Sequence, residues 1–500
     1  MNIVIETILI VDYGSQYTQL IARKIRELNV YCVVHPYNKI NQLISKENNF
    51  VGIILSGGPN SVLNKKSPQL NKRILKLNLP ILGICYGLQL LCKEFEGKIG
   101  QSNLREYGHA IISFKKKSII YHGIKNNNQV WMSHGDHIEK APKNFDITAV
   151  SKKNIIASIE NNNKKIFALQ FHPEVYHTKN GKKILFNFLN KICKINKKFK
   201  LENYLLNKIK IFKKKLDGEK VICGLSGGVD STVTSYLLHT TIGKDLFCIF
   251  IDHGFLRFNE SYEVENIFKK KFGNNFIRVD ASTIFLKRLK KITDPEKKRK
   301  IIGKTFIEVF ENEARKIKNV KYLAQGTLYP DIIESIPFFG GPTAKIKSHH
   351  NVGGLPKSMN LKIIEPLKEL FKDEVRLLGK KLKINSKLLN RHPFPGPGLA
   401  IRIPGSIDNN KIHILQKVDY IYTSYLIEKN LYNKIWQAFA VLLPVKSVGV
   451  MGDERTYSYS VSLRAVTSVD GMTADFYMFR KKDLIEISKR IISQIKEVNR

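Results

Sequence analysis

Short apolar runs alternate with amphipathic stretches along roughly the first 190 residues of the chain. Four of these runs have the length and the β-branched composition of buried strands, at residues 8–12, 30–34, 51–55 and 80–84. Between the first two, residues 16–28 carry apolar side chains at helical spacing. The order strand, helix, strand predicts an open parallel sheet covered by helices.

A second region with the same alternation follows a lysine-rich helical segment at residues 184–215, which we expect to contain the linker. Apolar runs at 220–225, 246–252 and 321–326 predict strands of a second open parallel α/β sheet. Residues 337–356 are rich in glycine and poor in apolar anchors, which predicts a mobile loop.

The pattern changes near residue 391, where the segment RHPFPGPG is rich in turn-forming residues. Beyond it we predict a helix at 409–429, strands at 435–443 and 457–466, and a last helix at 481–498. These elements predict a smaller α+β domain. The expected domains are residues 1–196, 197–391 and 392–500.

Composition excludes several classes of protein. The chain has 500 residues and is 43% hydrophobic, which is typical of a globular protein of several domains rather than a disordered or fibrous one. No apolar stretch is long enough to predict a membrane-spanning helix. The N-terminus contains Glu6 and no basic start, so no signal peptide is predicted. The six cysteines show no metal-ligand spacing, and we expect free thiols in the cytoplasm.

The net charge of +40 is compatible with a nucleic-acid partner. However, the excess is spread along the whole chain, and it is mostly lysine accompanied by asparagine and isoleucine. Those three residues have A/T-rich codons, so a base-biased genome accounts for the pattern without any partner. Anionic small-molecule substrates agree with the same sign. We therefore expect neither a nucleic-acid nor a membrane partner.

A nucleophile motif follows the strand at 80–84. Cys85 stands between Gly83 and Gly87 and precedes an apolar helix, as the nucleophile does in the strand–turn–helix elbow of hydrolases. The glycines permit a tight turn, and the helix N-terminus favours the thiolate. Cys85 alone could equally be a small core residue.

The other groups that a thiol nucleophile requires occur downstream. His172 and Glu174 are two residues apart after a strand-like run, and extended backbone would place them on one face. An imidazole delivers a proton to a leaving amine, and a carboxylate orients the imidazole. His172 alone could be a structural turn histidine. The turn at residues 56–59, with Gly58, offers backbone N–H groups for an oxyanion hole, a weaker signal because such turns are common.

Together these residues resemble the class I glutamine amidotransferases. In that family a cysteine attacks the side-chain amide of glutamine, forms a thioester and releases ammonia. The resemblance implies that Cys85 is the nucleophile, His172 the acid and base, and Glu174 the orienting carboxylate. The segment WMSHGD at 131–136 matches the family near its glutamine pocket.

A second site is indicated by a glycine turn between a strand and a helix. Its residues are Ser226, Gly227, Gly228, Val229, Asp230, Ser231 and Thr232. Paired glycines let backbone amides approach an anion, and the helix N-terminus adds positive potential. The spacing differs from the loop that binds a transferable γ-phosphate, and the lysine of that loop is absent. The motif resembles the PP-loop of the N-type ATP pyrophosphatases, which implies ATP binding and cleavage between the α and β phosphates. The alternative is a plain glycine turn capped by Asp230.

Further segments resemble the glutamine-hydrolysing GMP synthetases in order along nearly the whole chain. They are IDHGFLR (251–257), DPEKKRKIIG (294–303), LAQGTLYPDIIES (323–335), IKSHHNVGGLP (346–356), EPLKELFKDEVR (365–376), RHPFPGPGLAIR (391–402) and VGVMGDERTY (448–457). The resemblance implies that XMP is converted to GMP with ATP and with ammonia from glutamine. It also implies Mg²⁺ with ATP, no protein-bound metal or prosthetic group, and a homodimer formed by the C-terminal domain.

The same resemblance implies contacts to XMP from Arg257, Arg391 and Gln437. Two guanidinium groups are suited to a phosphate monoester. Arg391 could instead be a turn residue that pairs with a nearby acid, and Gln437 a hydrogen-bonding residue at a strand end. Lys345, Lys347, His349 and His350 lie in the predicted mobile loop, which resembles a lid over the triphosphate and is equally compatible with a disordered surface loop.

The sequence departs from the family at its end. Family members continue into a tail of the form K-P-P-x-T-x-E-W-E, whose lysine and glutamate contact XMP, whereas this sequence ends at Arg500. We expect either that the tail is absent from this gene product or that fewer contacts hold XMP. One lost lysine–phosphate contact would cost about 1.5–3 kcal/mol of binding.

Two other hypotheses remain open from the sequence. An RNA-modifying PP-loop enzyme would show steep salt dependence and would copurify with nucleic acid. The chain has no interleaved aromatic and basic stripes, which argues against it. A degenerate glutaminase remnant is contradicted by the intact nucleophile motif and PP-loop.

Overall fold

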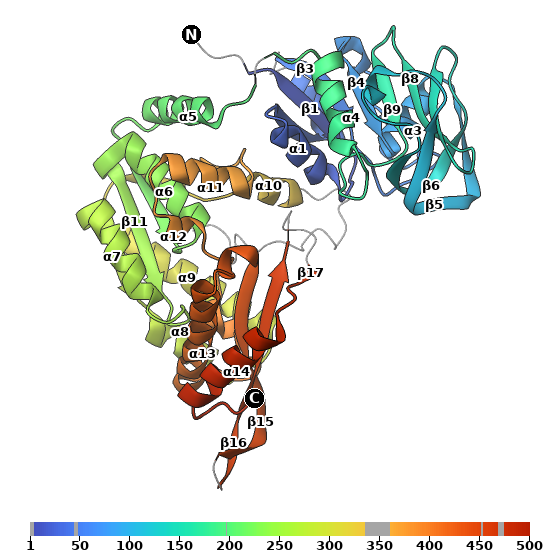
Figure 1. Ribbon diagram of the computed structural model, residues 1–500. Coiled ribbons are helices and arrows are strands. Elements are labelled where there is room, and N and C mark those ends of the chain that lie inside the picture. Colours follow the sequence, from blue (N-terminus) through green and yellow to red (C-terminus); the bar gives the residue numbers. More distant parts are fainter. Residues whose placement is uncertain (1–4, 45–48, 197, 336–360, 452–453, 469–474) are drawn as a thin grey trace. The chain divides into compact units, whose positions relative to one another are not determined.

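The computed structural model describes the chain except for residues 1–4, 45–48, 197, 336–360, 452–453 and 469–474 (Figure 1). The described residues form two compact units, the first comprising residues up to Tyr204 together with 333–335, and the second residues 205–332 together with 361–500. Each unit is built around its own sheet.

The first unit contains a nine-stranded sheet in the order β2-β1-β3-β4-β9-β8-β7-β5-β6. Its strands are β1 (Thr7–Asp12), β2 (Tyr31–Pro36), β3 (Phe50–Leu55), β4 (Ile81–Ile84), β5 (Lys98–Phe114), β6 (Asn128–Lys140), β7 (Asp146–Ser151), β8 (Ile156–Asn161) and β9 (Ile166–Leu169). The helices are α1 (Thr18–Glu27), α2 (Ile40–Ile44), α3 (Tyr86–Glu94) and α4 (Gly181–Asn187).

The strands β2, β1, β3, β4 and β9 are parallel neighbours, which confirms the predicted open α/β sheet. The four early strand predictions coincide with β1 to β4, and α1 occupies the predicted helix. All side chains of β1 are buried, as expected for a strand covered on both faces. The sheet also continues into four antiparallel strands that the apolar runs did not indicate.

The lysine-rich segment at 184–215, predicted to be helical and to contain the linker, is helical only in part. After α4 the chain makes a π-helical turn (Phe188–Ile192), and α5 (Leu201–Lys215) begins only eight residues beyond Cys193. Lys194 adopts a left-handed φ of 53°, which ends the helical run. The lysines on both sides fit either a helix or an exposed turn, so composition did not reveal the break.

The second unit contains a five-stranded, all-parallel sheet in the order β12-β11-β10-β13-β14. Its strands are β10 (Lys220–Leu225), β11 (Leu246–Asp252), β12 (Phe276–Asp280), β13 (Val320–Ala324) and β14 (Lys362–Ile364). The helices are α6 (Val229–Ile242), α7 (Glu260–Phe272), α8 (Ser282–Leu289), α9 (Pro295–Arg315), α10 (Tyr329–Ser335), α11 (Lys372–Lys381) and α12 (Ser386–Leu389). The predicted second parallel sheet is confirmed.

The C-terminal part of this unit is α+β, as predicted. It comprises a 3₁₀ helix η8 (Gly398–Arg402), α13 (Asn409–Glu428), β15 (Gln437–Met451), β16 (Glu454–Thr467), β17 (Asp475–Phe476) and α14 (Lys481–Gln494). The last helix ends four residues earlier than predicted, because Ile495 has extended dihedral angles.

One apolar core joins the parallel sheet to this C-terminal part. It runs from Ile222 and Ile249 of the sheet through Leu399 of η8 to Tyr422 of α13 and Ile487 of α14. Lys298 of α9 reinforces the junction, since its buried Nζ donates to the carbonyl oxygens of Ala400 at 3.2 Å and Ile403 at 2.6 Å. Residues on η8 and α13 are therefore held firmly against the sheet.

Candidate active sites

The first candidate site lies at the carboxyl edge of the first unit's sheet. Strands β3, β4 and β9 are parallel neighbours, and Ser56, Cys85 and Gln170 are the residues that directly follow them. Because parallel strands end at one edge, segments far apart in the sequence meet there. This topology brings Cys85 to the segment that carries His172.

Cys85 occupies a strained turn between β4 and α3. Its φ of 53° and ψ of −102° are unusual for a residue with a side chain. A Cβ on Gly87 would lie 2.5 Å from the carbonyl oxygen of Leu55, and a Cβ on Gly83 would lie 2.8 Å from the carbonyl carbon of Gly87. Both glycines are thus required by close packing, as the elbow motif predicted.

His172 and Glu174 form the second part of the site. His172 Nδ1 lies 2.7 Å from Glu174 Oε1, and both side chains are almost fully buried. We expected the two residues to share one face of a strand. This expectation is wrong, because β9 ends at Leu169 and the following residues form turns. The turn still brings the imidazole and the carboxylate together.

The environment of His172 favours its protonated form. Burial lowers the pKa of His172, but the carboxylate of Glu174 and the sulfur of Cys85 together outweigh burial. The pKa of His172 therefore lies well above its ordinary value. An imidazolium held between a thiol and a carboxylate can donate a proton to a leaving amine.

Backbone donors for an oxyanion come from two segments. Among the described residues, the N–H of Gly58 donates no hydrogen bond. Tyr86 follows the nucleophile and opens α3, where amides have no intrahelical acceptor. A Cβ on Gly58 would lie 2.9 Å from the carbonyl oxygen of Tyr13, so only glycine lets the chain pass here. This arrangement supports the predicted role of Gly58.

Three residues of this site, two of them beside the sulfur, were not identified individually from the sequence. Gln170 Nε2 lies 3.8 Å from Cys85 Sγ, and the buried Gln170 Oε1 has no partner among the described residues. The carbonyl oxygen of Ser133 lies 3.6 Å from the same sulfur. Gln89, one turn into α3, donates to the carbonyl oxygen of Asp136 at 3.1 Å. The segment at 131–136, noted from the sequence, is thus part of this site.

The second candidate site lies at the carboxyl end of β10. This strand has β11 on one side and β13 on the other, so successive strands diverge from it. In open α/β sheets, ligands bind where the strand order reverses in this way. The predicted phosphate loop, residues 226–232, joins β10 to α6 at this point.

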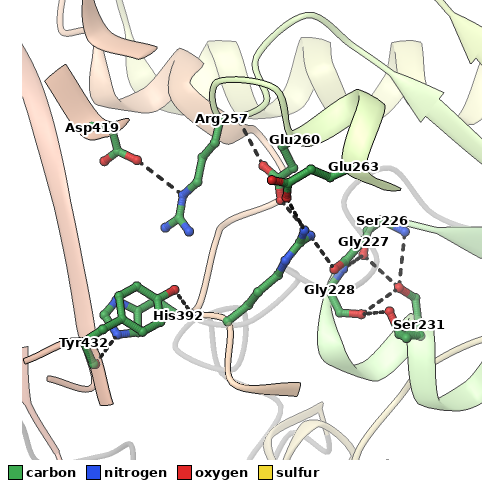
Figure 2. A network of polar contacts seen from close by, with 12 residues as sticks. Ser226, Gly227, Gly228, Ser231, Arg257, Glu260, Glu263, His392, Asp419 and Tyr432 are labelled. Atoms are coloured by element: carbon green, nitrogen blue, oxygen red, sulfur yellow. Dashed lines mark hydrogen bonds and ion pairs between the residues drawn. The ribbon is translucent and has the colours of Figure 1, made fainter. Parts of the chain in front are cut away.

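The loop is shaped by its own hydroxyl groups (Figure 2). Ser226 Oγ accepts from the N–H of Gly228 at 3.2 Å and lies 3.0 Å from Ser231 Oγ. Thr232 Oγ1 donates to the carbonyl oxygen of Gly228 at 2.7 Å. Gly227 has a φ of 73°, which requires glycine. The first amides of α6, from Val229 onward, have no intrahelical acceptor, and they therefore form an anion site.

The structure adds Lys372 to this loop. Lys372 Nζ of α11 lies 2.5 and 2.6 Å from the two carboxylate oxygens of Asp230. The carboxylate of Asp230, which could also have capped the turn, is engaged by Lys372. Lys372 lies in the segment 365–376, which resembles the GMP synthetases. The ion pair could not be predicted, because Lys372 and Asp230 are 142 positions apart in the sequence.

The residues predicted to contact XMP lie around this loop. Arg391 Nη1 lies 3.2 Å from the carbonyl oxygen of Gly227 and 3.1 Å from Glu260 Oε1. The ion pair with Glu260 is the alternative role that we considered for Arg391. The contact with Gly227 places the same guanidinium group on the phosphate loop. Arg257 is connected to Arg391 through Glu260, since the backbone N–H of Arg257 donates to Glu260 Oε2 at 3.0 Å (Figure 2).

Gln437 is the first residue of β15, and its Nε2 donates to the carbonyl oxygen of Pro393 at 3.1 Å. Pro393 lies two residues after Arg391, and the intervening His392 accepts through Nδ1 from the N–H of Ala438 at 3.1 Å. This contact fits a hydrogen-bonding residue at a strand end, and it also fixes Gln437 beside the segment that carries Arg391.

Other predictions concern metals, membranes and the lid. The described part of the chain contains no cluster of three or more His, Cys, Asp or Glu residues that could hold a metal ion. In the same residues, no helix is long and apolar enough to cross a membrane. All six cysteines are free. Lys345, Lys347, His349 and His350 lie outside the described residues.

Three family models match the chain in sequence. Residues 9–192 match glutamine amidotransferase class-I, residues 200–307 match NAD synthase, and residues 424–500 match the GMP synthase C terminal domain. The first match contains Cys85, His172 and Glu174, and the second contains the phosphate loop.

Curated relatives match over almost the whole chain. The glutamine-hydrolysing GMP synthase of Clostridium kluyveri is 50% identical over 495 residues, which is 99% of this chain and 96% of that protein. The enzyme of the same name from Aquifex aeolicus is 52% identical over 493 residues, again 99% of this chain and 96% of that protein. A third, from Cytophaga hutchinsonii, is 52% identical over 496 residues.

Proposed function

Because this chain belongs to the family of glutamine-hydrolysing GMP synthases, which are ATP-using ligases, we propose that its two candidate sites catalyse the two halves of that reaction. The first unit hydrolyses glutamine to ammonia and glutamate. The second unit activates XMP with ATP, and ammonia then completes GMP. The observation that carries the proposal is that one chain, related end to end to these enzymes, contains both a Cys85–His172–Glu174 arrangement and a phosphate loop.

In the first site the Cys85 thiolate attacks the side-chain carbonyl carbon of glutamine. The backbone N–H groups of Gly58 and Tyr86 stabilise the oxyanion that forms. His172, protonated, donates to the departing ammonia, and the thioester remains on Cys85. His172 then takes a proton from the water that hydrolyses the thioester, and Glu174 keeps the imidazole oriented throughout.

In the second site the loop from Ser226 to Thr232 holds the β and γ phosphates of ATP. The 2-oxygen of XMP attacks the α-phosphorus, pyrophosphate leaves, and ammonia displaces AMP from the adenylated purine. Arg257, Arg391 and Gln437 bind XMP. Mg²⁺ would neutralise the leaving pyrophosphate. Mg²⁺ commonly binds one or two carboxylates together with substrate phosphates, and Asp230 offers such a carboxylate at the loop.

A direct assay tests this function. The purified chain is incubated with XMP and Mg-ATP, and with either glutamine or ammonium, and the nucleotides are separated by chromatography. Equal amounts of GMP and AMP from both nitrogen sources are expected. Chelation of Mg²⁺ by EDTA should stop both reactions. The absence of GMP from either source at saturating XMP would contradict the proposal.

The pH dependence of glutamine hydrolysis tests the role of Glu174. Protonated His172 is needed as the acid, so activity should fall as the pH rises through the pKa of His172. In the wild type that pKa is raised well above its ordinary value, mainly by Glu174 and Cys85 acting against burial. The Glu174→Gln substitution removes the carboxylate charge, so the falling limb of the pH–rate profile should move to lower pH. The maximal rate of glutamine hydrolysis should also drop by about tenfold or more.

The control for this experiment is Glu160→Gln. Glu160 is a buried carboxylate of the same unit, but it pairs with Ser118 and Asn162 rather than with His172. Its replacement should leave the falling limb in place. An unchanged limb in Glu174→Gln would show that Glu174 does not set the protonation of His172.

We also propose that residues 1–196, 197–391 and 392–500 are the amidotransferase, ATP pyrophosphatase and C-terminal domains. The three family matches fall within these ranges, which supports the division. A cytoplasmic location is supported by the six free cysteines.

The C-terminal domain is proposed to form a homodimer. Helix α14 buries Ile487 and Ile491 in the core but leaves Leu484 and Ile485 about half exposed. These two residues, with Ile492, line an apolar hollow on the outer side of the helix. An apolar face of this kind is suited to a second copy of the helix.

Sedimentation tests the dimer. Ile485→Lys should shift the chain from dimer to monomer at micromolar concentration. Ile284→Lys, which changes a 46% exposed isoleucine on α8, should not. A dimer that survives Ile485→Lys would place the interface elsewhere.

A further inference from the structure

A buried carboxylate beside the proposed XMP site is shared by two arginines. Asp419 of α13 is 1% exposed. Its Oδ2 lies 3.4 Å from Arg257 Nε, and its Oδ1 lies 3.6 Å from Arg402 Nη1 (Figure 2 shows the first pair). Oδ1 also accepts from the N–H of Ala440 at 3.0 Å, which fixes the carboxylate on β15. Both arginine contacts are ion pairs at distances beyond those of good hydrogen bonds.

The guanidinium groups of Arg257 and Arg402 both contact the carboxylate of Asp419, and Glu260 adds a second negative charge that acts on both. Burial lowers the pKa of Arg402 to about 10, so its guanidinium remains charged at neutral pH. Two guanidinium groups therefore share one carboxylate. The buried Nε and Nη2 of Arg257 and both Nη atoms of Arg402 have no hydrogen-bond acceptor among the described residues. Such unused donors are costly unless an anion or a dipole meets them.

Aromatic rings hold the two guanidinium groups apart. Arg257 and Arg402 each lie 4.8 Å from the centre of the Phe394 ring. Arg402 also lies 4.1 Å from the centre of the Phe439 ring, so it is enclosed between two rings. Arg402 is 3% exposed, and it is therefore placed to act on its neighbours rather than on a ligand directly.

The same cluster is connected to the phosphate loop. The backbone N–H of Arg257 donates to Glu260, whose carboxylate in turn lies 3.1 Å from the guanidinium of Arg391. Arg391 contacts the carbonyl oxygen of Gly227. Glu260 thus links the backbone of Arg257 to the guanidinium of Arg391.

We propose that Asp419 and Arg402 are positioning residues for XMP binding. Asp419 holds Arg257 by its Nε edge and leaves the outer edge of the guanidinium for the nucleotide. Arg402 shares the carboxylate, so that Asp419 orients Arg257 without neutralising it. This inference rests on the proposed role of Arg257 in binding XMP.

The test uses the full chain in the ammonium-dependent assay, so that the first site plays no part. Asp419→Asn keeps the shape and the acceptor for Ala440 but removes the charge. It should raise the KM for XMP by about tenfold, with kcat and the KM for ATP unchanged. Arg257→Gln should raise the KM for XMP by roughly 10- to 100-fold. The double variant should be no worse than Arg257→Gln alone, because Asp419 acts through Arg257.

Each outcome separates this inference from the proposed function. If Arg257→Gln raises the KM for XMP but Asp419→Asn does not, or if the two effects multiply, the positioning role is overturned. If Arg257→Gln leaves that KM unchanged, the proposed XMP contact itself is wrong. An equal rise in the KM for XMP and for ATP would indicate a merely structural role and would also overturn the inference.

Two further variants guard against misfolding. Glu428 lies on α13, as Asp419 does, and forms an ion pair with Arg490 of α14. Glu428→Gln removes this ion pair and should leave the KM for XMP unchanged. Arg402→Lys keeps the charge but loses the planar contact with both rings, and it should raise the KM for XMP by about threefold. If Asp419→Asn does not fold, Arg402→Lys decides, since an unchanged KM for XMP in this variant overturns the proposal.

Discussion

Replacing Cys85 by alanine should abolish GMP formation from glutamine and leave GMP formation from ammonium at the wild-type rate. The sulfur is the only atom of the first site that can form the thioester, and neither His172 nor Glu174 can replace it. Removal of a nucleophile from a triad typically costs on the order of 10⁴-fold or more in rate. The second site does not use this sulfur, so it should accept ammonium supplied in solution.

The measurement compares initial rates of GMP formation with the two nitrogen sources for each variant. Cys92→Ala is the matched control, because Cys92 lies on the same helix, α3, but is fully buried, and burial raises the pKa of its thiol to about 12. Cys92→Ala should use both nitrogen sources. Glutamine-dependent activity in Cys85→Ala would show that another residue is the nucleophile.

Replacing Gly227 by valine should abolish GMP formation from both nitrogen sources. Gly227 has a φ of 73°, a conformation that costs other residues roughly 1–2 kcal/mol and β-branched residues more. A Cβ at this position would also lie 3.0 Å from Val264 and 3.4 Å from the Arg391 guanidinium. The loop would shift, and its amides would no longer converge on the phosphates. We expect a loss of at least about 100-fold in ATP-dependent turnover.

The chain offers a control with the same backbone conformation. Gly218 has a φ of 67°, and a Cβ there would meet nothing within 4 Å. Gly218→Val therefore introduces comparable backbone strain away from the phosphates. Glutamine hydrolysis without nucleotides should persist in both variants, which shows that the first unit is folded. If Gly218→Val loses ATP-dependent activity as fully as Gly227→Val, the effect is one of strain rather than of the phosphate loop.

Local motifs were readable from the sequence because their chemistry is contained in a few consecutive residues. The elbow around Cys85 needs small residues at Gly83 and Gly87, and the phosphate loop needs glycine at a left-handed position. Their places after apolar runs predicted that each would lie at the end of a strand. The parallel strands next to both motifs were predictable for the same reason, since burial on both faces leaves continuous apolar runs.

The sequence was less informative about exposed and half-buried elements, where no continuous apolar run marks a strand or a helix end. The long strands β5 and β6 pair with each other, β6 alternates between buried and partly buried positions, and much of the sequence of both is polar. The break after α4 depends on one left-handed residue, Lys194, among lysines that would also suit a helix. In both places the competing patterns have similar local energies, and tertiary packing decides between them.

By itself, then, the sequence determined the nucleophile motif, the phosphate loop and the parallel strands that carry them, because each depends on the covalent chain over a few residues. Only the tertiary structure decided which charged groups meet. Lys372 reaches Asp230 across 142 positions, and Arg257 reaches Asp419 across a similar interval. The physical reason is that an ion pair depends on distance in space and on burial. Sheet order and the shared apolar core set both of these, and no local pattern of residues records them.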